Sequence, residues 1–240
     1  MSIKKHILTL VGNDLHISYQ SDRCIREFID FARKEQPDKI ILNGDVMDLG
    51  EIGKFDSAPN PEHSLLTEIK LTRQFFQTLR KHAPNSQIIY ELANHENRFR
   101  QDLIINSPKY YELMEEEGFN LETILGLKNL GIECITQEQK SASWIGSYVI
   151  DQGFAIGHFK KVAKNSGYTV TNLMNDFWCS VIQGHVHRMG MISKTPLGGK
   201  VYYGIESGCL CELKPDYMLH ANWQNGYVYI KDGEPHLVYL

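Results

Sequence analysis

Apolar residues in the first half of the chain fall into short runs separated by longer stretches with helical spacing. The runs at 6–12, 39–43 and 87–92 predict strands, because each is a brief apolar stretch that ends in polar or turn-forming residues. Residues 21–35 and 61–82 carry apolar side chains at intervals of three and four, which predicts helices. This alternation of strands and helices indicates βαβ units, and therefore a parallel sheet.

The pattern changes in the second half of the chain. Residues 97–128 are expected to be helical but irregular, and a further helix is expected at 168–177. Short strands are expected at 132–136, 147–150, 154–157, 181–184, 190–193, 201–205, 227–230 and 236–239. These later strands predict a second, more antiparallel sheet packed on the first. The fold class is therefore α/β, a two-sheet β-sandwich flanked by helices.

Composition supports a globular protein. The 240 residues are 42% hydrophobic and 22% charged, with a formal net charge of −4, which excludes a disordered or collagen-like chain. No linker-like stretch divides the sequence, so residues 1–240 are expected to form a single domain. The weak negative charge gives no global attraction to nucleic acid or to an anionic membrane, so a phosphate-binding site must carry its own positive charge.

The same composition bears on the compartment. No apolar run reaches about 18 residues, so a membrane-spanning helix is not expected. The apolar run near the N-terminus is short and no small-residue cleavage site follows it, so it is interpreted as a first strand rather than a signal peptide. The five cysteines are an odd number and do not have the spacing of a disulfide framework, which favours reduced thiols. We therefore expect a cytoplasmic protein, in the host cytoplasm if the chain is phage-encoded.

Five short polar segments each follow a predicted strand. They are Asp14-Leu15-His16, Gly44-Asp45-Val46-Met47-Asp48, Asn94-His95-Glu96, Gly157-His158 and Gly184-His185-Val186-His187. Taken alone, each histidine is more often a hydrogen-bonded structural side chain, and a D-x-H triplet arises readily by chance. The ordered series is much more specific, since the carboxyl ends of strands in open α/β sheets are where ligands bind.

The side chains of these segments suit metal ions. Carboxylate oxygens, an amide oxygen and imidazoles come from Asp14, His16, Asp45, Asn94, His158, His185 and His187. This mixed set favours Mn²⁺, Fe or Zn²⁺ over Ca²⁺ or an iron–sulfur cluster. The ligands are too many for one tetrahedral site and sufficient for two sites that share an aspartate. If the segment is extended, His185 and His187 project to the same side, so that adjacent ions each take one.

Two such cations would leave the site positively charged even after two aspartates and a bridging hydroxide are counted. A pair of ions about 3.5–4 Å apart lowers the pKa of a bridging water and clamps the oxygens of an in-line displacement. The expected substrate is therefore a phosphate ester.

The series D-x-H, G-D-x-x-D, N-H-E, H and G-H-x-H resembles the calcineurin-like metallophosphoesterase superfamily, over residues 14–187. The resemblance implies a two-sheet sandwich and a dinuclear centre. It places Asp14, His16, Asp45 and His187 on the first ion, with Asp45 bridging. It places Asn94, His158 and His185 on the second ion. It also implies that His95 is catalytic, binding a phosphoryl oxygen or protonating the leaving group, and that the Asp48 carboxylate orients His95.

Finer details resemble the small phosphoesterases of tailed phages and prophages, through the stretches NHENRFR, GHVHR and ESGCLCELKPDY. This resemblance implies that residues 205–240 form a C-terminal cap or sheet extension. One departure is Ala93, where the family has glycine before N-H-E; alanine fits there if its φ is negative.

Some residues have two interpretations. Arg98 is a candidate substrate-binding residue that would pair with a phosphate, although the solvated face of a helix explains it equally well. Glu96 is expected to stabilise its loop. Cys209 and Cys211 form C-x-C, but without a partner pair they are not predicted to bind metal.

The leading hypothesis is hydrolysis of a phosphoester, favoured to be a phosphodiester in a nucleotide or nucleic acid, by a hydroxide that bridges two divalent transition-metal ions. Manganese is the favoured metal, with Fe, Zn, Co and Ni as alternatives. The competing hypotheses are a phosphomonoesterase, acting on a phosphoprotein or a small nucleotide, and a non-catalytic metal-binding scaffold. No membrane partner is expected, and the sequence leaves the oligomeric state open, a dimer included.

Overall fold

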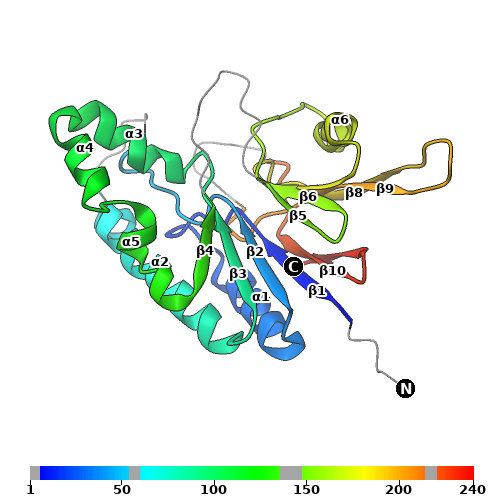
Figure 1. The fold of residues 1–240 in the computed structure, drawn as a ribbon, viewed down its shortest axis with the longest axis horizontal. Helices are drawn as coiled ribbons and strands as arrows, with labels where there is room; N and C mark the ends of the chain where they lie inside the picture. The colour runs from blue at the N-terminus through cyan, green and yellow to red at the C-terminus, as the bar shows by residue number, and fades with distance from the viewer. Residues whose placement is uncertain (1–5, 54–59, 136–147, 214–220) are drawn as a thin grey trace.

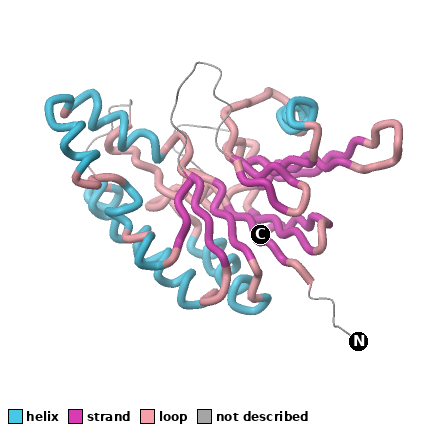
Figure 2. The backbone as a smooth tube through the Cα atoms, viewed as in Figure 1, coloured by secondary structure: helices cyan, strands magenta, loops and turns pink. Residues whose placement is uncertain are grey.

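The computed structural model describes residues 6–53, 60–135, 148–213 and 221–240. Two β-sheets pack against each other, and helices cover their outer faces (Figures 1 and 2). The expected fold class is confirmed. In the described part of the chain, no helix is long and apolar enough to cross a bilayer.

The first sheet has the strand order β11-β10-β1-β2-β3-β4. Its strands are β1 (Leu8–Gly12), β2 (Lys39–Asn43), β3 (Gln87–Glu91), β4 (Ile132–Ile135), β10 (Gly226–Lys231) and β11 (Glu234–Tyr239). Strands β1 to β4 are parallel, with Leu10 opposite Ile40 and Ile40 opposite Ile88. Strand β10 pairs with β1 antiparallel, and β11 completes a hairpin at that edge.

The second sheet has the order β5-β6-β7-β9-β8. Its strands are β5 (Val149–Asp151), β6 (Phe154–Gly157), β7 (Ser180–Gln183), β8 (Met189–Lys194) and β9 (Tyr202–Ser207). The central pairs β6–β7 and β7–β9 are parallel, whereas the outer pairs are antiparallel. This sheet is therefore mixed.

Alternation along the strands explains the layering. In β2, Ile41 belongs to the apolar cluster between the two sheets, whereas Ile40 and Leu42 belong to the cluster on the helical side of the first sheet. Neighbouring residues of a strand face opposite sides, so a strand that lies between a helical layer and a second sheet needs apolar residues on both of its faces.

Helix α1 (Asp22–Glu35) buries Cys24, Phe28 and Ala32, which are spaced by four and therefore lie on one face. Helix α2 (Leu65–His82) buries Phe75, Phe76 and Leu79 in the same way. The predicted helix at 61–82 is interrupted, because Ser64 caps α2 by accepting a hydrogen bond from Thr67 N, and a 3₁₀ turn (Pro61–His63) precedes it.

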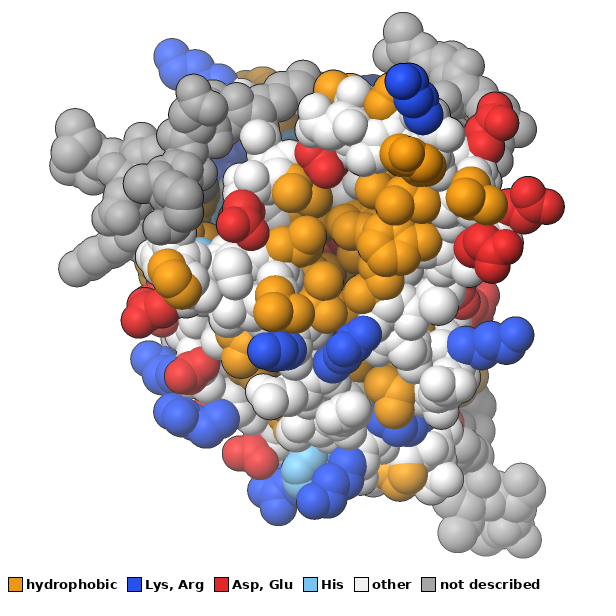
Figure 3. Space-filling view, turned by 90° about the vertical axis from the view of Figure 1, so that its left-hand side faces the viewer, with side chains coloured by type: hydrophobic (Ala, Val, Ile, Leu, Met, Phe, Trp, Pro, Cys, Tyr) orange, Lys and Arg blue, Asp and Glu red, His pale blue; other side chains and the backbone are white. Residues whose placement is uncertain are grey.

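The remaining helices are α3 (Glu96–Asn106), α4 (Pro108–Glu116), α5 (Leu121–Leu125) and α6 (Tyr168–Phe177), with a 3₁₀ turn at Lys128–Leu130. Helix α6 covers the second sheet, against β7 and β9 (Figure 1). Helix α4 has no buried residue. Apolar side chains gather on the side of the molecule where α3 and α4 lie (Figure 3). Exposed apolar residues on these two helices include Ile105, Tyr110 and Leu113.

The allocation of strands to sheets corrects the sequence-based expectation. The strands expected at 132–136, 227–230 and 236–239 were assigned to the second sheet, but β4, β10 and β11 join the first. Residues 136 and 147, at the ends of two expected strands, lie outside the described residues. The pattern of apolar residues predicts that a segment is a strand, whereas its neighbour is decided by backbone pairing. Here β10 satisfies the edge of β1, which would otherwise present unpaired backbone groups.

Candidate metal centre

The five polar segments lie where strands of both sheets end. Asp14 follows β1, Asp45 follows β2, and Asn94 follows β3. In the second sheet, His158 directly follows β6, and the segment with His185 and His187 follows β7. The carboxyl ends of parallel strands share an edge, and packing of the two sheets brings both edges together.

Hydrogen bonds join the segments to one another. His16 N donates to the carbonyl of Asp45 at 3.0 Å, and His185 N donates to Oδ2 of Asp14 at 2.8 Å. Asp14 therefore connects the end of the first strand to a loop of the second sheet, 171 residues away along the chain.

A first group of possible ligands consists of Asp14, His16 and His187, all buried, with one ligand atom of each within 4.8 Å of the others. Nε2 of His187 lies 3.0 Å from Oδ1 of Asp14 and 3.1 Å from Nε2 of His16. His16 directs its other nitrogen, Nδ1, to Oδ1 of Asp48 at 2.9 Å. Its Nε2 is therefore the nitrogen that faces the group.

A second group consists of Asp45, His158 and His185. Nε2 of His158 lies 3.0 Å from Oδ2 of Asp45 and 3.9 Å from Oδ1 of Asp14. The rings of His158 and His185 meet edge to face, with centroids 5.0 Å apart. Asp45 also belongs to a third group, with His16 and His95. Its carboxylate is thus shared between neighbouring sets of ligands.

The charges of the buried groups favour cations between them. Burial raises the pKa of Asp14, but the neighbouring imidazoles of His187 and His158 outweigh this and hold its pKa well below the usual range. The pKa of Asp45 is likewise lowered, because His158 and His95 outweigh the effect of burial. Both carboxylates are therefore ionised although they are buried, and a nearby positive charge stabilises them.

The protonation of His158 also reflects the negative charge of the two aspartates. Its Nδ1 lies 2.9 Å from the carbonyl oxygen of Asn43, which can only accept, so Nδ1 carries a proton. Burial lowers the pKa of His158, but Asp45 and Asp14 overcome this and raise it to about 10. The Nε2 atom that faces Asp45 therefore holds a proton where a metal ion would satisfy the same carboxylates.

Three buried polar atoms of the group lack a well-aligned hydrogen bond, although two of them lie 3.0 Å from a charged neighbour: Oδ1 of Asp14, Oδ1 of Asn94 and Nε2 of His158. Buried polar atoms are nearly always paired, so such orphans need an explanation. Atoms of this kind, oxygen and imidazole nitrogen, are ligands for Mn²⁺, Fe and Zn²⁺. The residues present therefore fit the binding of transition-metal ions.

The backbone of the centre is strained. Asp14, His16, Asp45, His185 and His187 all have positive φ, between 46° and 72°. Left-handed backbone is uncommon for residues with a side chain and persists where surrounding structure enforces it, often at functional sites. Ala93, which replaces a glycine of the resembled family, does not have a positive φ, so alanine is accommodated there.

Two glycines allow the close approach of these segments. At Gly44, where φ is +82°, a Cβ atom would lie 2.5 Å from Cβ of Ala93 and 2.7 Å from Nδ1 of His158. At Gly184, a Cβ atom would lie 2.9 Å from Nδ1 of His158 and 3.1 Å from Oδ2 of Asp14. Side chains at these positions would separate the loops that carry the possible ligands.

The arrangement of His185 and His187 differs from the expectation of an extended segment. Both residues have left-handed backbone and lie in a turn after β7, not in a strand. They therefore reach different groups, His185 the second and His187 the first, by a turn rather than by strand alternation.

His95 lies at the edge of the centre, and its backbone N–H donates to Oδ1 of Asp45 at 3.1 Å. Its Nδ1 donates to the backbone carbonyl of Asp48 at 2.6 Å, while the Asp48 carboxylate lies 3.4 Å from Nδ1. Asp48 thus contacts His95 chiefly through its main chain, and its carboxylate hydrogen-bonds His16 instead. The neighbouring histidines lower the pKa of Asp48 against the opposing effect of burial.

Arg98 lies next to His95, and its role as a substrate-binding residue stays a prediction. It donates to the carbonyl of Asp48 at 2.9 Å and to Nε2 of His95 at 3.0 Å. The guanidinium is therefore beside the centre rather than on a solvated helix face.

Glu96 holds the two loops of the first sheet together. Its carboxylate accepts hydrogen bonds from the backbone N–H groups of Asp45, Met47 and Ala93 and from the hydroxyl of Tyr90, at 2.7–3.2 Å. These contacts agree with the expectation that Glu96 stabilises its loop.

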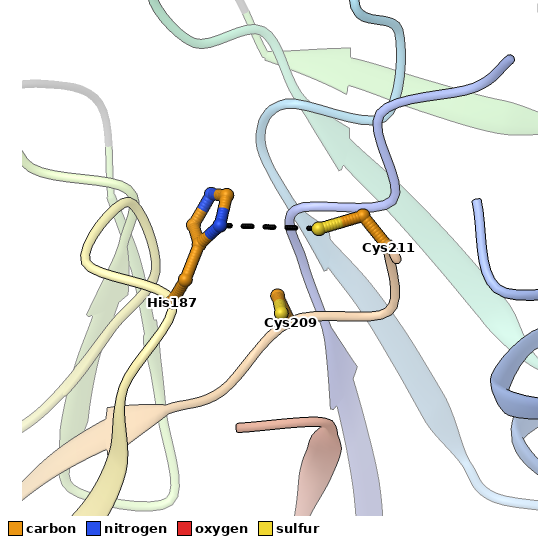
Figure 4. A group of neighbouring side chains, drawn as sticks. All are labelled: His187, Cys209 and Cys211. Carbon is orange, nitrogen blue, oxygen red and sulfur yellow. Dashed lines mark hydrogen bonds between the residues drawn. The ribbon is translucent and has the colours of Figure 1, made fainter. Parts of the chain in front are cut away.

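Sequence reasoning missed the surroundings of His187. Cys209 and Cys211, which were assigned no metal, lie with His187 in a fourth group whose possible ligand atoms are within 4.8 Å of one another (Figure 4). The C-x-C spacing was the available signal, but the third member of the group, His187, comes from the loop after β7.

A mixed α/β sandwich with clustered aspartate, histidine and asparagine at its strand ends defines a metal-dependent phosphoester hydrolase. Residues 8–189 match the family described as calcineurin-like phosphoesterase, and the chain belongs to that family. Two phage proteins are similar to it. The "Gene 54 protein" of Mycobacterium phage L5 is 27% identical over 236 residues, which cover 94% of this chain and 89% of the relative. The "Gene 54 protein" of Mycobacterium phage D29 is 28% identical over 229 residues, covering 91% and 86%.

Among solved structures, Vps29 from Chaetomium thermophilum is similar with a TM-score of 0.46 and 8% sequence identity, covering 93% of this chain and 84% of that one. The resemblance to phage-type members of the calcineurin-like superfamily is confirmed by the family match and the phage relatives.

Proposed function

We propose that the protein hydrolyses a phosphodiester, in a nucleotide or nucleic acid, with two divalent transition-metal ions, manganese being favoured. Asp14, His16, Asp45 and His187 would hold the first ion. Asp45, Asn94, His158 and His185 would hold the second. We further propose that residues 1–240 form one domain, in which residues 205–240 extend the first sheet and cap the site.

The position of Asp45 is the observation that carries this proposal. Its carboxylate belongs to one group with His16 and His95 and to another with His158 and His185. A carboxylate has two oxygens with several lone pairs, so one aspartate between two sets of ligands suits a shared, bridging position. The first group, around Asp14, completes the other half of the pair.

Bound divalent cations would supply a water nucleophile of lowered pKa and neutralise charge on the phosphoryl oxygens. The chain itself orients the groups around them. Asp48 fixes the ring of His16 through its carboxylate and the ring of His95 through its carbonyl. His95, held in this way, is placed to meet a phosphoryl or leaving-group oxygen at Nε2. Arg98 is placed to hydrogen-bond the same phosphate once it leaves Nε2 of His95.

The proposed preference for a phosphodiester is supported by the relatives of the chain rather than by the geometry of the site. The relatives over nearly the whole chain are phage proteins, and phosphodiesters are the bonds of nucleic acid. The metal preference follows from the ligands, which are nitrogen and oxygen atoms in both groups around the aspartates.

The experiment is a comparison of substrates after metal removal and reloading with Mn²⁺. An aryl phosphodiester, the matching aryl phosphomonoester and single-stranded DNA would be assayed side by side, with metal content measured by elemental analysis. We expect two ions per chain and faster hydrolysis of the diester. Hydrolysis of the monoester alone would contradict the diester proposal, and metal binding without hydrolysis of any substrate would favour the scaffold.

A further inference from the structure

Two buried thiols lie against the outer nitrogen of a candidate metal ligand. Cys209 and Cys211 follow β9, and both are free and almost fully buried. Figure 4 shows them with His187, which comes from the loop after β7. Sγ of Cys211 lies 3.8 Å from Nδ1 of His187.

The two nitrogens of His187 face different surroundings. Nε2 faces oxygen and nitrogen, Oδ1 of Asp14 at 3.0 Å and Nε2 of His16 at 3.1 Å. Nδ1 faces sulfur. Histidines that bind metals generally direct their second nitrogen to a carboxylate or carbonyl oxygen, which can only accept a hydrogen bond. Here that place is taken by two thiols, which can themselves bind a cation.

The loop that carries the thiols is held by backbone hydrogen bonds on both sides. Leu210 N donates to the carbonyl of Asp14 at 3.1 Å, and Cys209 N donates to the carbonyl of Gln224 at 3.0 Å. The side chain of Asn225 donates to the carbonyl oxygens of Cys209 and Cys211, at 3.2 and 2.7 Å. The thiols are therefore positioned before any ligand arrives, and the ordering cost of a site is small.

The spacing is close to that of a tetrahedral thiolate site. Bond lengths of about 2.3 Å to sulfur and about 2.0–2.1 Å to nitrogen place sulfur and nitrogen about 3.6 Å apart in tetrahedral zinc. The separation between Cys211 Sγ and His187 Nδ1 is 3.8 Å, and all three atoms lie within 4.8 Å of one another. Side-chain movements of less than one bond length would bring the two sulfur atoms and Nδ1 to coordination distance from one cation.

Charge and softness favour a particular class of cation. Two thiolates neutralise a divalent cation, which suits a site this deeply buried. Sulfur selects thiophilic ions such as Zn²⁺ or Cd²⁺, whereas each of the other groups offers one aspartate and two histidines, a set without sulfur that also accepts harder ions such as Mn²⁺.

We propose that Cys209, Cys211 and Nδ1 of His187 form a separate site for a thiophilic divalent cation, next to the proposed catalytic pair. Binding releases the two thiol protons to solvent and takes the lone pair of Nδ1, so the proton of the neutral ring moves to Nε2. That nitrogen then has no lone pair for the first ion of the pair. A thiophilic cation would thus weaken Mn²⁺ binding through His187. This last consequence rests on the proposed function, whereas binding at the thiols does not.

The test is titration of the reduced, metal-free full-length protein with Cd²⁺ alone, followed by thiolate-to-cadmium charge-transfer absorption in the ultraviolet. We expect the band to grow up to one equivalent in the unmodified protein and in Cys134→Ser, whose thiol lies on β4 outside the cluster. The band should be lost in Cys209→Ser and in Cys211→Ser. Absence of the band in the unmodified protein, or its persistence in both serine variants, would overturn the proposal.

A second measurement needs no variant and so does not depend on how the serine proteins fold. The ¹¹³Cd resonance of the unmodified protein with one equivalent of cadmium should fall in the thiolate-coordinated range; a resonance typical of only nitrogen and oxygen ligands would overturn the site. Mn²⁺ affinity, measured by electron paramagnetic resonance, should fall about tenfold in the cadmium-loaded protein, a typical coupling between linked sites. Unchanged Mn²⁺ affinity alongside a thiolate resonance would overturn only the coupling through His187.

Discussion

Arg98 donates a hydrogen bond to Nε2 of His95 at 3.0 Å. A guanidinium only donates, so Nε2 must accept, and the ring proton lies on Nδ1, where it meets the carbonyl of Asp48. The guanidinium of Arg98 therefore covers Nε2 of His95. A substrate oxygen that contacts Nε2 has to displace the guanidinium, which stays within reach of the phosphate.

Replacing His95 by alanine is expected to separate metal binding from hydrolysis. The aspartate and histidine groups outside His95 stay intact, so His95→Ala should keep its metal ions. Its rate on an aryl phosphodiester should fall by about 10²–10⁴-fold, the usual contribution of a positioned acid or base. His82→Ala, at the end of α2 and away from the centre, is the matched control. A wild-type rate in His95→Ala would refute the proposed role.

Asp45→Asn should lose both metal and activity. The amide keeps the size of the side chain but removes the charge and one of two equivalent acceptor oxygens that the proposed bridge needs. Elemental analysis after dialysis should show less than the full pair of ions, with hydrolysis reduced in parallel. Asp30→Asn, on the exposed face of α1, controls for the loss of a negative charge. Two tightly held ions in Asp45→Asn would contradict the bridging position.

Glu96→Gln should destabilise the protein without replacing the side chain of a proposed ligand. An amide presents N–H donors to some of the four donors that the carboxylate now satisfies, so buried groups lose their partners. The free energy of unfolding in metal-free buffer should fall by about 2–3 kcal/mol. Tyr90→Phe removes only one of the four hydrogen bonds and should cost about 1 kcal/mol. Equal stabilities of Glu96→Gln and Tyr90→Phe in urea unfolding would show that the backbone contacts contribute nothing.

Glu68 on α2 predicts a pH dependence of stability. Its side chain is fully buried, Oε2 accepts a hydrogen bond from Leu49 N at 2.7 Å, and Oε1 has no hydrogen-bond partner. Burial raises its pKa to about 8, with Asp48 adding to the effect. The folded protein therefore binds a proton that the unfolded chain releases near pH 4.5, so this contribution to stability is complete below that pH and is lost as the pH rises to about 8.

Glu68→Gln should remove this dependence, because the amide is neutral at every pH. In buffer with a chelator, the stability of the unmodified protein should fall by about 2–4 kcal/mol more than that of Glu68→Gln between pH 5 and pH 8. Glu62→Gln, which changes an exposed glutamate nearby, should follow the unmodified protein. Parallel stability curves for Glu68→Gln and the unmodified protein would contradict the raised pKa.

Several features followed from the sequence by itself. The apolar run at 39–43 coincides with β2, and the predicted helix at 168–177 coincides with α6, because period and length of an apolar pattern are local properties. The ordered polar segments also placed the candidate site at strand ends, since the position of a residue after a strand is itself local. The sequence alone therefore indicated the candidate ligands and their order along the chain.

Only the tertiary structure decided which strands became neighbours and which way side chains turned. Strand β10 pairs with β1 across more than 200 residues of chain, and no local pattern encodes that partner. Left-handed backbone at His185 and His187 sends the two imidazoles to different groups, against the alternation expected of a strand. The thiols of Cys209 and Cys211 acquired a histidine partner in the same way. Such contacts form because the packing of two sheets brings distant loops together, and that packing is a property of the whole chain.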